Sequence, residues 1–308
     1  MKAIVYEKYG PPEVLKLKEV KKPVPKDNEV LIKNYAATVH IGDTRVRSFR
    51  VPFKVWLPMR LFLGIRKPKK TILGMEVSGV IESMGKDVKG FHKGDEVFAL
   101  TGFNFGGYAQ YSCVIAEDGD EKKGMVGHKP SNITFEEAAA VPAGALTALA
   151  HIQKVNLQKG KKILIYGASG SVGTYAVQLA KYYGAEVTGV CSTSNLELVK
   201  SIGAEKVIDY TKEDFSKNSE VYDVVFDAVF KIPRSRCKKV LKKNGIYDSS
   251  HSKIPEIKTK DLLFLKELIE KNKLKPIIDR AYPMEQIVEA HRYVDKGHKK
   301  GNVVITIK

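Results

Sequence analysis

Three glycines at three-residue spacing, Gly167, Gly170 and Gly173, form the pattern in this chain that points most directly to a chemical role. In such a pattern a first glycine permits a sharp turn, a second lets backbone N–H groups approach a pyrophosphate, and a third lets the following helix lie close to the preceding strand. The positive end of that helix would face the bound anion. The spacing predicts a dinucleotide site, and a packing turn without a ligand is the alternative.

The segments on either side of the glycines have the lengths that a dinucleotide site requires. A short apolar strand is predicted at 162–166, a helix at 172–183 and a second strand at 186–191, with Gly184 ending the helix. In this context the residues of the turn that we expect to contact a cofactor are Gly167, Ser169, Gly170, Ser171, Val172 and Gly173.

The rest of the chain shows two kinds of pattern. Residues 1 to about 110 contain short strands separated by turn residues, which predicts a barrel-like β domain. Beyond them, helices alternate with strands, which predicts a parallel sheet covered on both faces. A closing strand at 301–308 has no obvious place in that second sheet. We therefore expect the chain to return to the first domain near residue 275.

The composition is that of a soluble globular protein, with 308 residues, 43% of them hydrophobic and 28% charged. Its three cysteines are widely spaced and include no C-x-x-C pair, so neither a disulfide framework nor a cysteine-rich zinc site is predicted. The N-terminal residues lack the apolar core of a signal peptide. These features favour a reducing cytoplasm as the location.

The net charge of +17 raises the affinity for polyanions in general. The lysines lie in small scattered groups without interleaved aromatic residues, so we expect a solvated basic surface and no nucleic-acid partner. The apolar segment at 51–65 is too short and too charged to span a membrane. We interpret it as an amphipathic flap over an apolar pocket, with a core segment or a membrane-surface contact as alternatives.

Taken together, several long segments resemble the zinc-free quinone oxidoreductase (zeta-crystallin-like) branch of the medium-chain dehydrogenase/reductase superfamily. The resemblance runs almost end to end, through MKAIVYEKYGPPEVLKLKEV, GMEVSGVIESMGKDVKGFHKGDEVF, ITFEEAAAVPAGALTAL, ILIYGASGSVGTYAVQLAKYYGAEVTGVCS and YPMEQIVEAHRYVDKGHKKGNVVI. It implies an α/β protein with a GroES-like β-barrel catalytic domain at 1–125 and 275–308 and a Rossmann domain, a doubly wound parallel sheet, at 126–274. A nicotinamide cofactor would lie in the cleft between them.

The same resemblance implies that no zinc is bound. Zinc alcohol dehydrogenases have a cysteine where this chain has His40, a histidine where it has Met75, and a further cysteine at or near Ala143. Residues 100–108 leave no room for their four-cysteine structural loop. One histidine and the carboxylate of Glu76 do not provide the three protein ligands that a catalytic zinc needs.

Without a metal, another group must polarise the acceptor carbonyl. Members of the branch place an asparagine, followed three residues later by an aspartate, beside the nicotinamide, and this chain has His40 and Asp43 at those positions. A histidine can donate a hydrogen bond and can also deliver a proton near neutral pH. The alternative is that His40 only packs at the domain interface. We expect Asp43 to order its loop, and Arg47 to lie in the cleft.

Cofactor choice is determined at the end of the second strand, where an acidic residue would bind the ribose of NAD. This chain has no acid at 191–195, so NADP(H) is preferred over NAD(H), although relatives often carry a lysine where Ser194 stands. The further cofactor contacts that the resemblance implies are Ser192, Thr193, Ser194, Tyr210, Thr147 and Val229.

Two departures from the branch bear on activity. Phe230 stands where relatives have a glycine close to the nicotinamide ribose. Only 12 residues, 249–260, separate Asp248 from Asp261, where relatives have further strands and often a dimer contact. The parallel sheet is therefore expected to lack a strand or two, and the homodimer that the resemblance implies would lose that contact. Asp248, at the end of a buried strand, needs a partner or exposure to water.

The predicted reaction is hydride transfer from NADPH to an apolar substrate, either a quinone or the β-carbon of an α,β-unsaturated carbonyl, with His40 polarising the acceptor oxygen and His40 or solvent providing the proton. An NADPH-dependent aldehyde or alcohol oxidoreductase is one alternative. A catalytically idle NADPH-binding protein that acts on RNA through its basic surface is the other.

Overall fold

The contacts of the chain divide it into two units, which are described separately below. Unit 1 comprises 1–143, 258–266 and 278–308, and unit 2 comprises 144–257 and 267–277. The structure is a computed structural model that describes residues 1–117 and 119–308, with only the backbone of Lys54 described.

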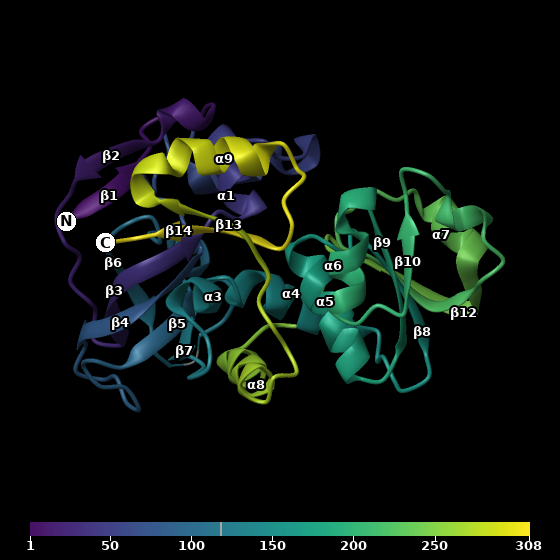
Figure 1. Cartoon of the computed structure of the whole chain (residues 1–308). Helices are drawn as coiled ribbons and strands as arrows, with labels where there is room; N and C mark the ends of the chain where they lie inside the picture. Colours follow the sequence, from purple (N-terminus) through teal and green to yellow (C-terminus); the bar gives the residue numbers. More distant parts are fainter. Residues whose placement is uncertain (118) are drawn as a thin grey trace. The chain divides into compact units, whose positions relative to one another are not determined.

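Unit 1 is built on a sheet of seven strands in the order β13-β14-β3-β4-β5-β7, with β6 paired to β3 beside β14 (Figure 1). A separate hairpin joins β1 (Lys2–Val5) to β2 (Lys16–Glu19). The sheet strands are β3 (Glu29–Thr38), β4 (Glu76–Met84), β5 (Glu96–Leu100), β6 (Tyr111–Ile115), β7 (Met125–His128), β13 (Ile278–Pro283) and β14 (Asn302–Thr306). The sheet buries one continuous apolar cluster, which includes Ile32, Val77, Val97 and Val303.

Helices of unit 1 pack on this sheet and on one another. The short helix α3 (Phe135–Ala139) packs on β3 and β4, while α9 (Ile287–Asp295) packs on α1 (Ile41–Ser48) and on β14 (Figure 1). The helix α2 (Trp56–Leu63) follows α1. Short 3₁₀ turns in the whole chain are η1 (Pro12–Val14), η2 (Phe53–Val55), η3 (Gly102–Asn104), η4 (Thr193–Asn195), η5 (Phe215–Lys217) and η6 (Met284–Gln286).

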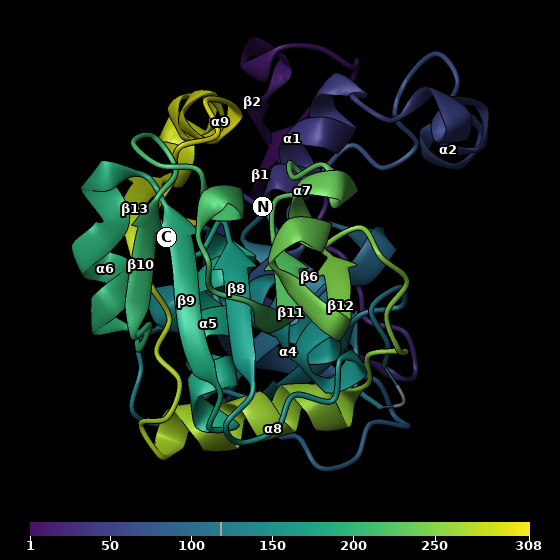
Figure 2. The ribbon, with the colours of Figure 1, turned by 90° about the vertical axis from the view of Figure 1, so that its right-hand side faces the viewer.

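Unit 2 contains a parallel sheet of five strands in the order β10-β9-β8-β11-β12 (Figure 2). The strands are β8 (Lys162–Tyr166), β9 (Glu186–Cys191), β10 (Lys206–Asp209), β11 (Tyr222–Asp227) and β12 (Leu241–Ser249). The apolar residues of β8 are completely buried, as expected for a central strand covered on both faces. β9 lies on one side of β8 and β11 on the other, so the chain changes direction across the sheet at the end of β8, where open α/β sheets bind their ligands.

The helices of unit 2 connect these parallel strands. α5 (Ser171–Tyr182) packs on β8 and β9, α6 (Leu196–Ser201) on β9 and β10, and α7 (Arg234–Val240) on β12. Two further helices cross the division between the units, namely α4 (Pro142–Lys154) and α8 (Thr259–Glu270).

The predicted combination of a β domain with a parallel α/β sheet is confirmed. The contacts divide the chain later than the predicted boundary at 125/126, because β7 pairs with β5 in the sheet of unit 1 and α3 packs on that same sheet. The chain enters unit 1 again at Lys258–Lys266, returns to unit 2, and joins unit 1 finally at Ile278, whereas the sequence predicted a single return near residue 275. Among the described residues the parallel sheet has five strands and ends at β12.

Candidate functional site

The turn between β8 and α5 has the geometry that its glycines predict. Gly167 has a φ of 78°, a left-handed conformation that favours glycine. A Cβ on Gly173 would lie 2.1 Å from the carbonyl oxygen of Gly167, so only a glycine lets the first turn of α5 approach the strand this closely. Gly170 is the N-cap of α5 and precedes the N–H groups of Ser171, Val172 and Gly173, which form the first turn. This is a cradle for a pyrophosphate at a helix N-terminus.

Two loops of unit 2 are tied to this turn. The amide nitrogen of Asn195 donates to Oγ of Ser169 at 2.9 Å and to Oγ of Ser192 at 3.2 Å. These bonds join the glycine turn to the loop after β9, which carries Ser192, Thr193 and Ser194. Asn195 was not among the predicted site residues, because nothing in its sequence neighbourhood indicates that it reaches across to Ser169.

An acid lies beside the predicted ribose-binding loop, although residues 191–195 contain none. Asp209 ends β10, and because Asp209 pairs with Cys191 in the β9 ladder its carboxylate reaches the next loop. Thr193 Oγ1 donates to Asp209 Oδ2 at 2.5 Å, and both N–H and Oγ1 of Thr211 donate to Oδ1. The hydrogen bonds from Thr193 and Thr211 lower the pKa of this carboxyl, so it is ionised at neutral pH.

Cationic and aromatic groups flank this acid. Lys212 Nζ lies 3.9 Å from Asp209 Oδ2, and its side chain is largely exposed. Tyr210, a predicted cofactor contact, is also exposed, and its N–H donates to the carbonyl of Cys191 at 3.1 Å. The structure thus places Ser192, Thr193 and Tyr210 around one loop cluster, and adds Asp209 and Lys212 to it.

The loop after β11 lies against the glycine turn. Buried Asp227 accepts hydrogen bonds from the N–H groups of Val229, Lys231 and Ile232 and so fixes this loop. The side chain of Val229 lies next to Gly167, since a Cβ there would be 2.7 Å from Val229 Cγ1. Of the predicted cofactor contacts, Val229 is therefore brought to the turn.

Two remaining predictions fall on the same unit. Phe230 has a φ of 54°, a left-handed conformation in a position where the resemblance implies glycine, and its ring stacks on His251 with centroids 4.3 Å apart. Thr147 lies half-buried on α4.

Unit 1 gathers the predicted catalytic residues at the start of α1. His40 is the N-cap of this helix, and its Nδ1 accepts a hydrogen bond from the N–H of Gly42 at 3.0 Å. Asp43 Oδ2 accepts from the N–H of His40 at 3.0 Å, and Asp43 Oδ1 accepts from the N–H of Gly74 at 3.1 Å. Asp43 therefore orders this loop, as predicted from the sequence.

The bond to Gly42 fixes the chemistry of the His40 ring. Burial, with further repulsion from Lys299 and Arg45, lowers the pKa of His40 to about 4, so the ring is neutral at pH 7. A neutral imidazole that accepts at Nδ1 carries its proton on Nε2. His40 can consequently donate a hydrogen bond from Nε2, but it does not exchange a proton near neutral pH, contrary to one of the two roles expected from its residue type.

A buried acid lies beside this loop. Glu76 accepts hydrogen bonds from the hydroxyl of Thr38 and, at 2.6 Å, from the N–H of Ala143. Burial raises the pKa of Glu76 to about 7 and that of Asp43 to about 6, while burial lowers the pKa of nearby Lys299 to about 8. The charge carried by these three groups therefore changes between about pH 6 and 8.

The positions that the resemblance compares with zinc ligands lie close to these groups. Met75 Sδ and His40 Nδ1 both lie next to Gly42, within 3.5 Å of where a Cβ on that residue would stand, and Ala143 is bonded to Glu76. Among the residues that the structure describes, no group of three or more His, Cys, Asp and Glu side chains is arranged to hold a metal ion.

Arg47 does not lie in a cleft. Its guanidinium is completely buried, with NH1 2.9 Å from His291 Nδ1 and NH2 2.6 Å from Asp295 Oδ2. The expectation of a cleft residue is wrong, because α9 packs on α1 and its His291 and Asp295 side chains bind the guanidinium inside unit 1.

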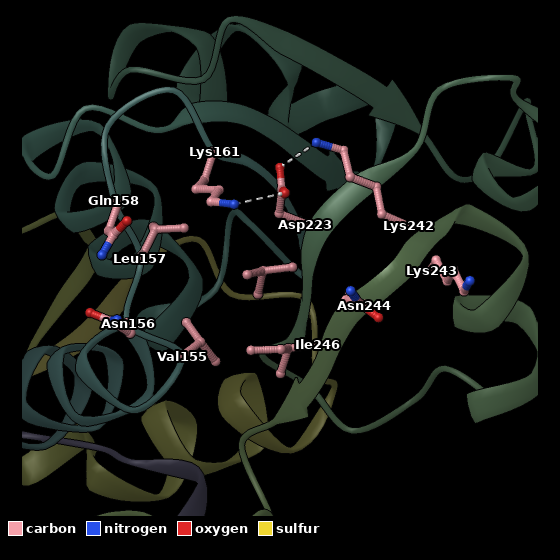
Figure 3. A pocket seen from close by; sticks show the side chains of 12 residues that line it. Val155, Asn156, Leu157, Gln158, Lys161, Asp223, Lys242, Lys243, Asn244 and Ile246 are labelled. Atoms are coloured by element: carbon pink, nitrogen blue, oxygen red, sulfur yellow. Dashed lines mark hydrogen bonds and ion pairs between the residues drawn. The ribbon is translucent and has the colours of Figure 1, made fainter.

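A cavity of about 600 Å³ lies at the opposite end of the parallel strands from the glycine turn (Figure 3). It lies at the amino ends of β8 and β11, where Asp223 bridges Lys161 and Lys242 at 3.4 and 2.8 Å (Figure 3). Ligands of open α/β sheets bind at the carboxyl ends of the strands, so this cavity is not the dinucleotide site.

Comparison with family models identifies three matching regions. An alcohol dehydrogenase GroES-like domain matches residues 26–151, and models described as zinc-binding dehydrogenase match residues 171–247 and 247–305.

Individual proteins match over the full length of the chain. The 2-methylene-furan-3-one reductase of Solanum lycopersicum is 37% identical over 99% of this chain and 79% of its own length. The chloroplastic NADPH-dependent alkenal/one oxidoreductase of Arabidopsis thaliana is 35% identical with the same coverage. Among solved structures, the quinone oxidoreductase from Coxiella burnetii is 28% identical and superposes with a TM-score of 0.83, covering 100% of this chain and 99% of its own.

Proposed function

This chain belongs to the medium-chain dehydrogenase/reductase superfamily, and from that premise we propose that it is a zinc-independent oxidoreductase that uses NADPH to reduce quinones or α,β-unsaturated carbonyls. Three of its relatives are named for activities on a methylene-furanone, on alkenals and alkenones, and on quinones, and these substrates share one electronic feature. Each acceptor has a carbonyl whose oxygen gains negative charge as hydride arrives.

The observation that carries this proposal is the state of His40. The imidazole of His40 is neutral and is held by the N–H of Gly42, so its Nε2–H is a donor that can stabilise the developing charge on an acceptor oxygen without a metal. The neighbouring Met75 thioether is a poor zinc ligand in this setting, and the carboxylate of Glu76 is already occupied by Thr38 and Ala143.

The residues of unit 2 fit the cofactor. Because Gly173 has no Cβ, α5 can lie close to β8, and it presents its first-turn N–H groups at the position where a pyrophosphate would bind. NADPH, when bound, supplies the hydride. The chain's own contribution is to bind and orient: Asn195 holds the two loops together, and Val229 packs on Gly167.

The proton that completes the reduction comes from solvent in this proposal. With a pKa of about 4, His40 carries no exchangeable cationic proton at pH 7, so it polarises the oxygen and does not protonate it. We further propose that NADPH is favoured by Lys212, which supplies near Tyr210 the cation that Ser194 lacks.

The test is NADPH oxidation measured against a panel of quinones, enals, enones and saturated aldehydes. We expect turnover with the first three and little with the last; turnover of saturated aldehydes alone would favour the aldehyde reductase alternative. Tight NADPH binding with no turnover on any acceptor would contradict the proposal and favour a binding protein.

The role of His40 is tested in the same assay. His40→Ala is expected to lower turnover by about 100-fold to 1000-fold, the range seen when one oxyanion donor is lost. His40→Asn restores the donor found in the branch and should retain most of the activity. His92→Ala, an exposed histidine of unit 1, is the matched control.

A further inference from the structure

The segment from Thr44 to Met75 in unit 1 has an extreme charge bias. It contains nine lysines and arginines and no aspartate or glutamate, the cations being Arg45, Arg47, Arg50, Lys54, Arg60, Arg66, Lys67, Lys69 and Lys70. The exposed ones among them are Arg45, Arg50, Arg66, Lys67, Lys69 and Lys70. All the charged side chains that this segment presents to solvent are therefore positive.

The same segment exposes its large apolar side chains. Along η2, α2 and the residue pair that follows, the exposed fractions are 94% for Phe53, 43% for Trp56, 61% for Leu57, 55% for Leu61, 50% for Phe62 and 65% for Ile65. On α2 itself Leu63 is buried, whereas Leu57 and Leu61 face outward. The two aromatic rings are half-exposed, because Trp56 packs edge-on against Phe49 at 6.0 Å and Phe62 against Phe103 at 5.6 Å between ring centroids. Contiguous exposed apolar groups of this kind mark a surface that another apolar phase covers.

The outward direction of these side chains is fixed by contacts inside unit 1. The guanidinium of Arg60 lies 3.9 Å from the centroid of the Phe49 ring and 4.6 Å from that of Tyr9. The hydroxyl of Tyr9 donates to the carbonyl of Gly64 at 3.0 Å, and Lys69 Nζ donates to the carbonyl of Leu61 at 2.7 Å. These contacts hold one side of α2 on the domain, so the opposite side cannot turn inward.

The expected flap over an apolar pocket describes only part of this segment. A cavity of about 220 Å³ does lie beside Phe62, Leu63, Phe103 and Phe105, but Phe62 and Phe103 are themselves 50% and 43% exposed. Phe53, Leu57 and Ile65 do not line that cavity and point to solvent.

We propose that the α2 segment, residues 50–70, docks unit 1 on an anionic lipid surface. Leucine, phenylalanine and tryptophan side chains would enter the headgroup and acyl boundary, and the flanking cations at 66–70 would contact lipid phosphates. A helix that lies on the membrane needs no spanning length, and no helix in the described part of the chain is long and apolar enough to cross one. The inference rests on this surface alone and not on the proposed reaction.

A lipid surface fits better than RNA or a protein partner. Sequence-independent RNA binding uses aromatic rings spaced along a basic groove, whereas here aliphatic Leu57, Leu61 and Ile65 make up half of the apolar face. The absence of any acid over 44–75 matches a uniformly anionic surface, while protein surfaces present both signs of charge.

Trp56 allows a direct test, because it is the only tryptophan of the chain and lies on α2. The full-length protein is titrated with vesicles of phosphatidylcholine alone and of phosphatidylcholine with phosphatidylglycerol, while tryptophan fluorescence and co-sedimentation are recorded. We expect a blue shift and sedimentation with the anionic vesicles only, and quenching of Trp56 by lipids brominated on the acyl chain.

Variants separate docking from general attraction of a basic protein to anions. Leu57→Ser with Leu61→Ser removes apolar area and keeps Trp56, and it should lower partitioning into anionic vesicles at least tenfold. Arg66→Gln with Lys67→Gln should lower it by a similar factor. The matched controls, Val24→Ser for an exposed apolar residue and Lys238→Gln with Lys239→Gln for charge, should change it less than twofold.

The proposal is overturned if the wild-type chain does not bind anionic vesicles, or if the charge control lowers binding as much as the α2 variants do. It is also overturned if Trp56 is quenched by added single-stranded RNA or on concentrating the protein, but not by brominated lipid, since the segment would then contact RNA or a second copy of the chain. Circular dichroism and NADPH titration of each variant establish that it is folded.

Discussion

The imidazole of His40 and the carboxylate of Asp43 form a reciprocal capping box at the N-terminus of α1. Asp43 Oδ2 accepts from the N–H of His40 at 3.0 Å, while His40 Nδ1 accepts from the N–H of Gly42 two residues further on. The residue type at 40 therefore sets both the start of α1 and the tautomer of the ring. An asparagine in the same place could cap and donate in the same way, which explains how the two residue types can share this position.

Replacing Asp43 by asparagine tests this coupling. Both oxygens of Asp43 accept backbone N–H groups, from His40 and Gly74, and the amide of Asn can accept only one of them. We expect a loss of about 1–3 kcal/mol in unfolding free energy, together with lower turnover at unchanged NADPH affinity. Chemical denaturation and steady-state kinetics measure the two effects. Asp87→Asn on the surface is the control, and full stability in Asp43→Asn would show that the loop is held by other contacts.

Glu76 predicts a stability that falls as the pH rises. Below pH 4.5 this carboxyl is protonated in both folded and unfolded chains, and between 4.5 and about 7 only the folded chain keeps the proton. Its contribution is thus complete at low pH and lost by about pH 7. Glu76→Gln does not ionise, and its amide oxygen can accept from the N–H of Ala143 while its NH2 donates to the hydroxyl oxygen of Thr38. It should therefore be more stable than wild type at pH 8 by up to about 3 kcal/mol. As the pH rises from 5 to 8, the melting temperature of Glu76→Gln should increasingly exceed that of the wild type. Melting curves that differ by the same amount at every pH would contradict the prediction.

Cofactor preference is tested at Lys212. Removing this cation by Lys212→Ala should weaken NADPH about three- to tenfold and leave NADH affinity nearly unchanged, since an exposed charge acts on the 2′-phosphate only. The carboxylate of Asp209 would repel that phosphate, so Asp209→Asn should raise the affinity for NADPH relative to that for NADH. Fluorescence titration with both cofactors reports the ratio. Lys217→Ala is a charge control elsewhere in unit 2, and equal losses for NADPH and NADH in Lys212→Ala would remove the residue from phosphate recognition.

The glycine turn makes a steric prediction. A methyl group at Gly173 would stand 2.1 Å from the Gly167 oxygen, so Gly173→Ala must push α5 away from β8. We expect NADPH affinity to fall more than tenfold, with a lower melting temperature. Gly170→Ala is the comparison for packing, since its Cβ would lie 3.4 Å from the same oxygen and its φ of −80° suits alanine, so its melting temperature should stay near that of the wild type. Wild-type NADPH affinity in Gly173→Ala would show that the cofactor does not depend on the close approach of α5.

A buried ion cluster anchors the edge strand of the parallel sheet. His151 Nδ1 and Lys154 Nζ each lie 2.7 Å from a different oxygen of Asp248, which answers the requirement for a partner predicted from the sequence. Burial alone would raise the pKa of Asp248, but the bonds from His151 and Lys154 lower it to about 2. Its stabilisation is present above pH 3.8 and lost as the pH falls towards 2.

Asp248→Asn should therefore cost about 3 kcal/mol at pH 7, because it leaves the two bases without an anion, and the cost should shrink below pH 4. Urea denaturation at pH 7 and pH 3 provides the comparison, with Asp87→Asn as the control. An equal cost at both values would mean that packing, and not charge, is lost.

Local patterns predicted those parts of the protein in which the chain determines its own conformation. The strand, turn and helix around Gly167 lie within one continuous segment, so spacing and periodicity were sufficient. The same holds for β3 and β4, which lie between turn residues and have mainly buried or half-buried residues.

Features that depend on pairing between distant segments were missed. Asp209 joins the ribose loop only because β10 pairs with β9 in one register, and Arg47 is buried by His291, which is 244 residues away in the sequence. The strand β13 was not predicted, because half of its residues are polar or exposed and its place is set by β14. The pKa of His40 could not be inferred from its residue type, since burial and Lys299 determine it.

The position of β14 sets the order in which the chain can complete its folding. Val304 of this strand pairs with Thr38 on one side and with Ala281 on the other, so the sheet of unit 1 has a gap until the last residues of the sequence have been made. The five strands of unit 2 all lie within 144–257 and can pair while the ribosome is still adding that C-terminal strand. Long-range closure of this kind is slow. We therefore expect unit 2 to fold before unit 1, whose sheet is complete only when β14 has paired with β3.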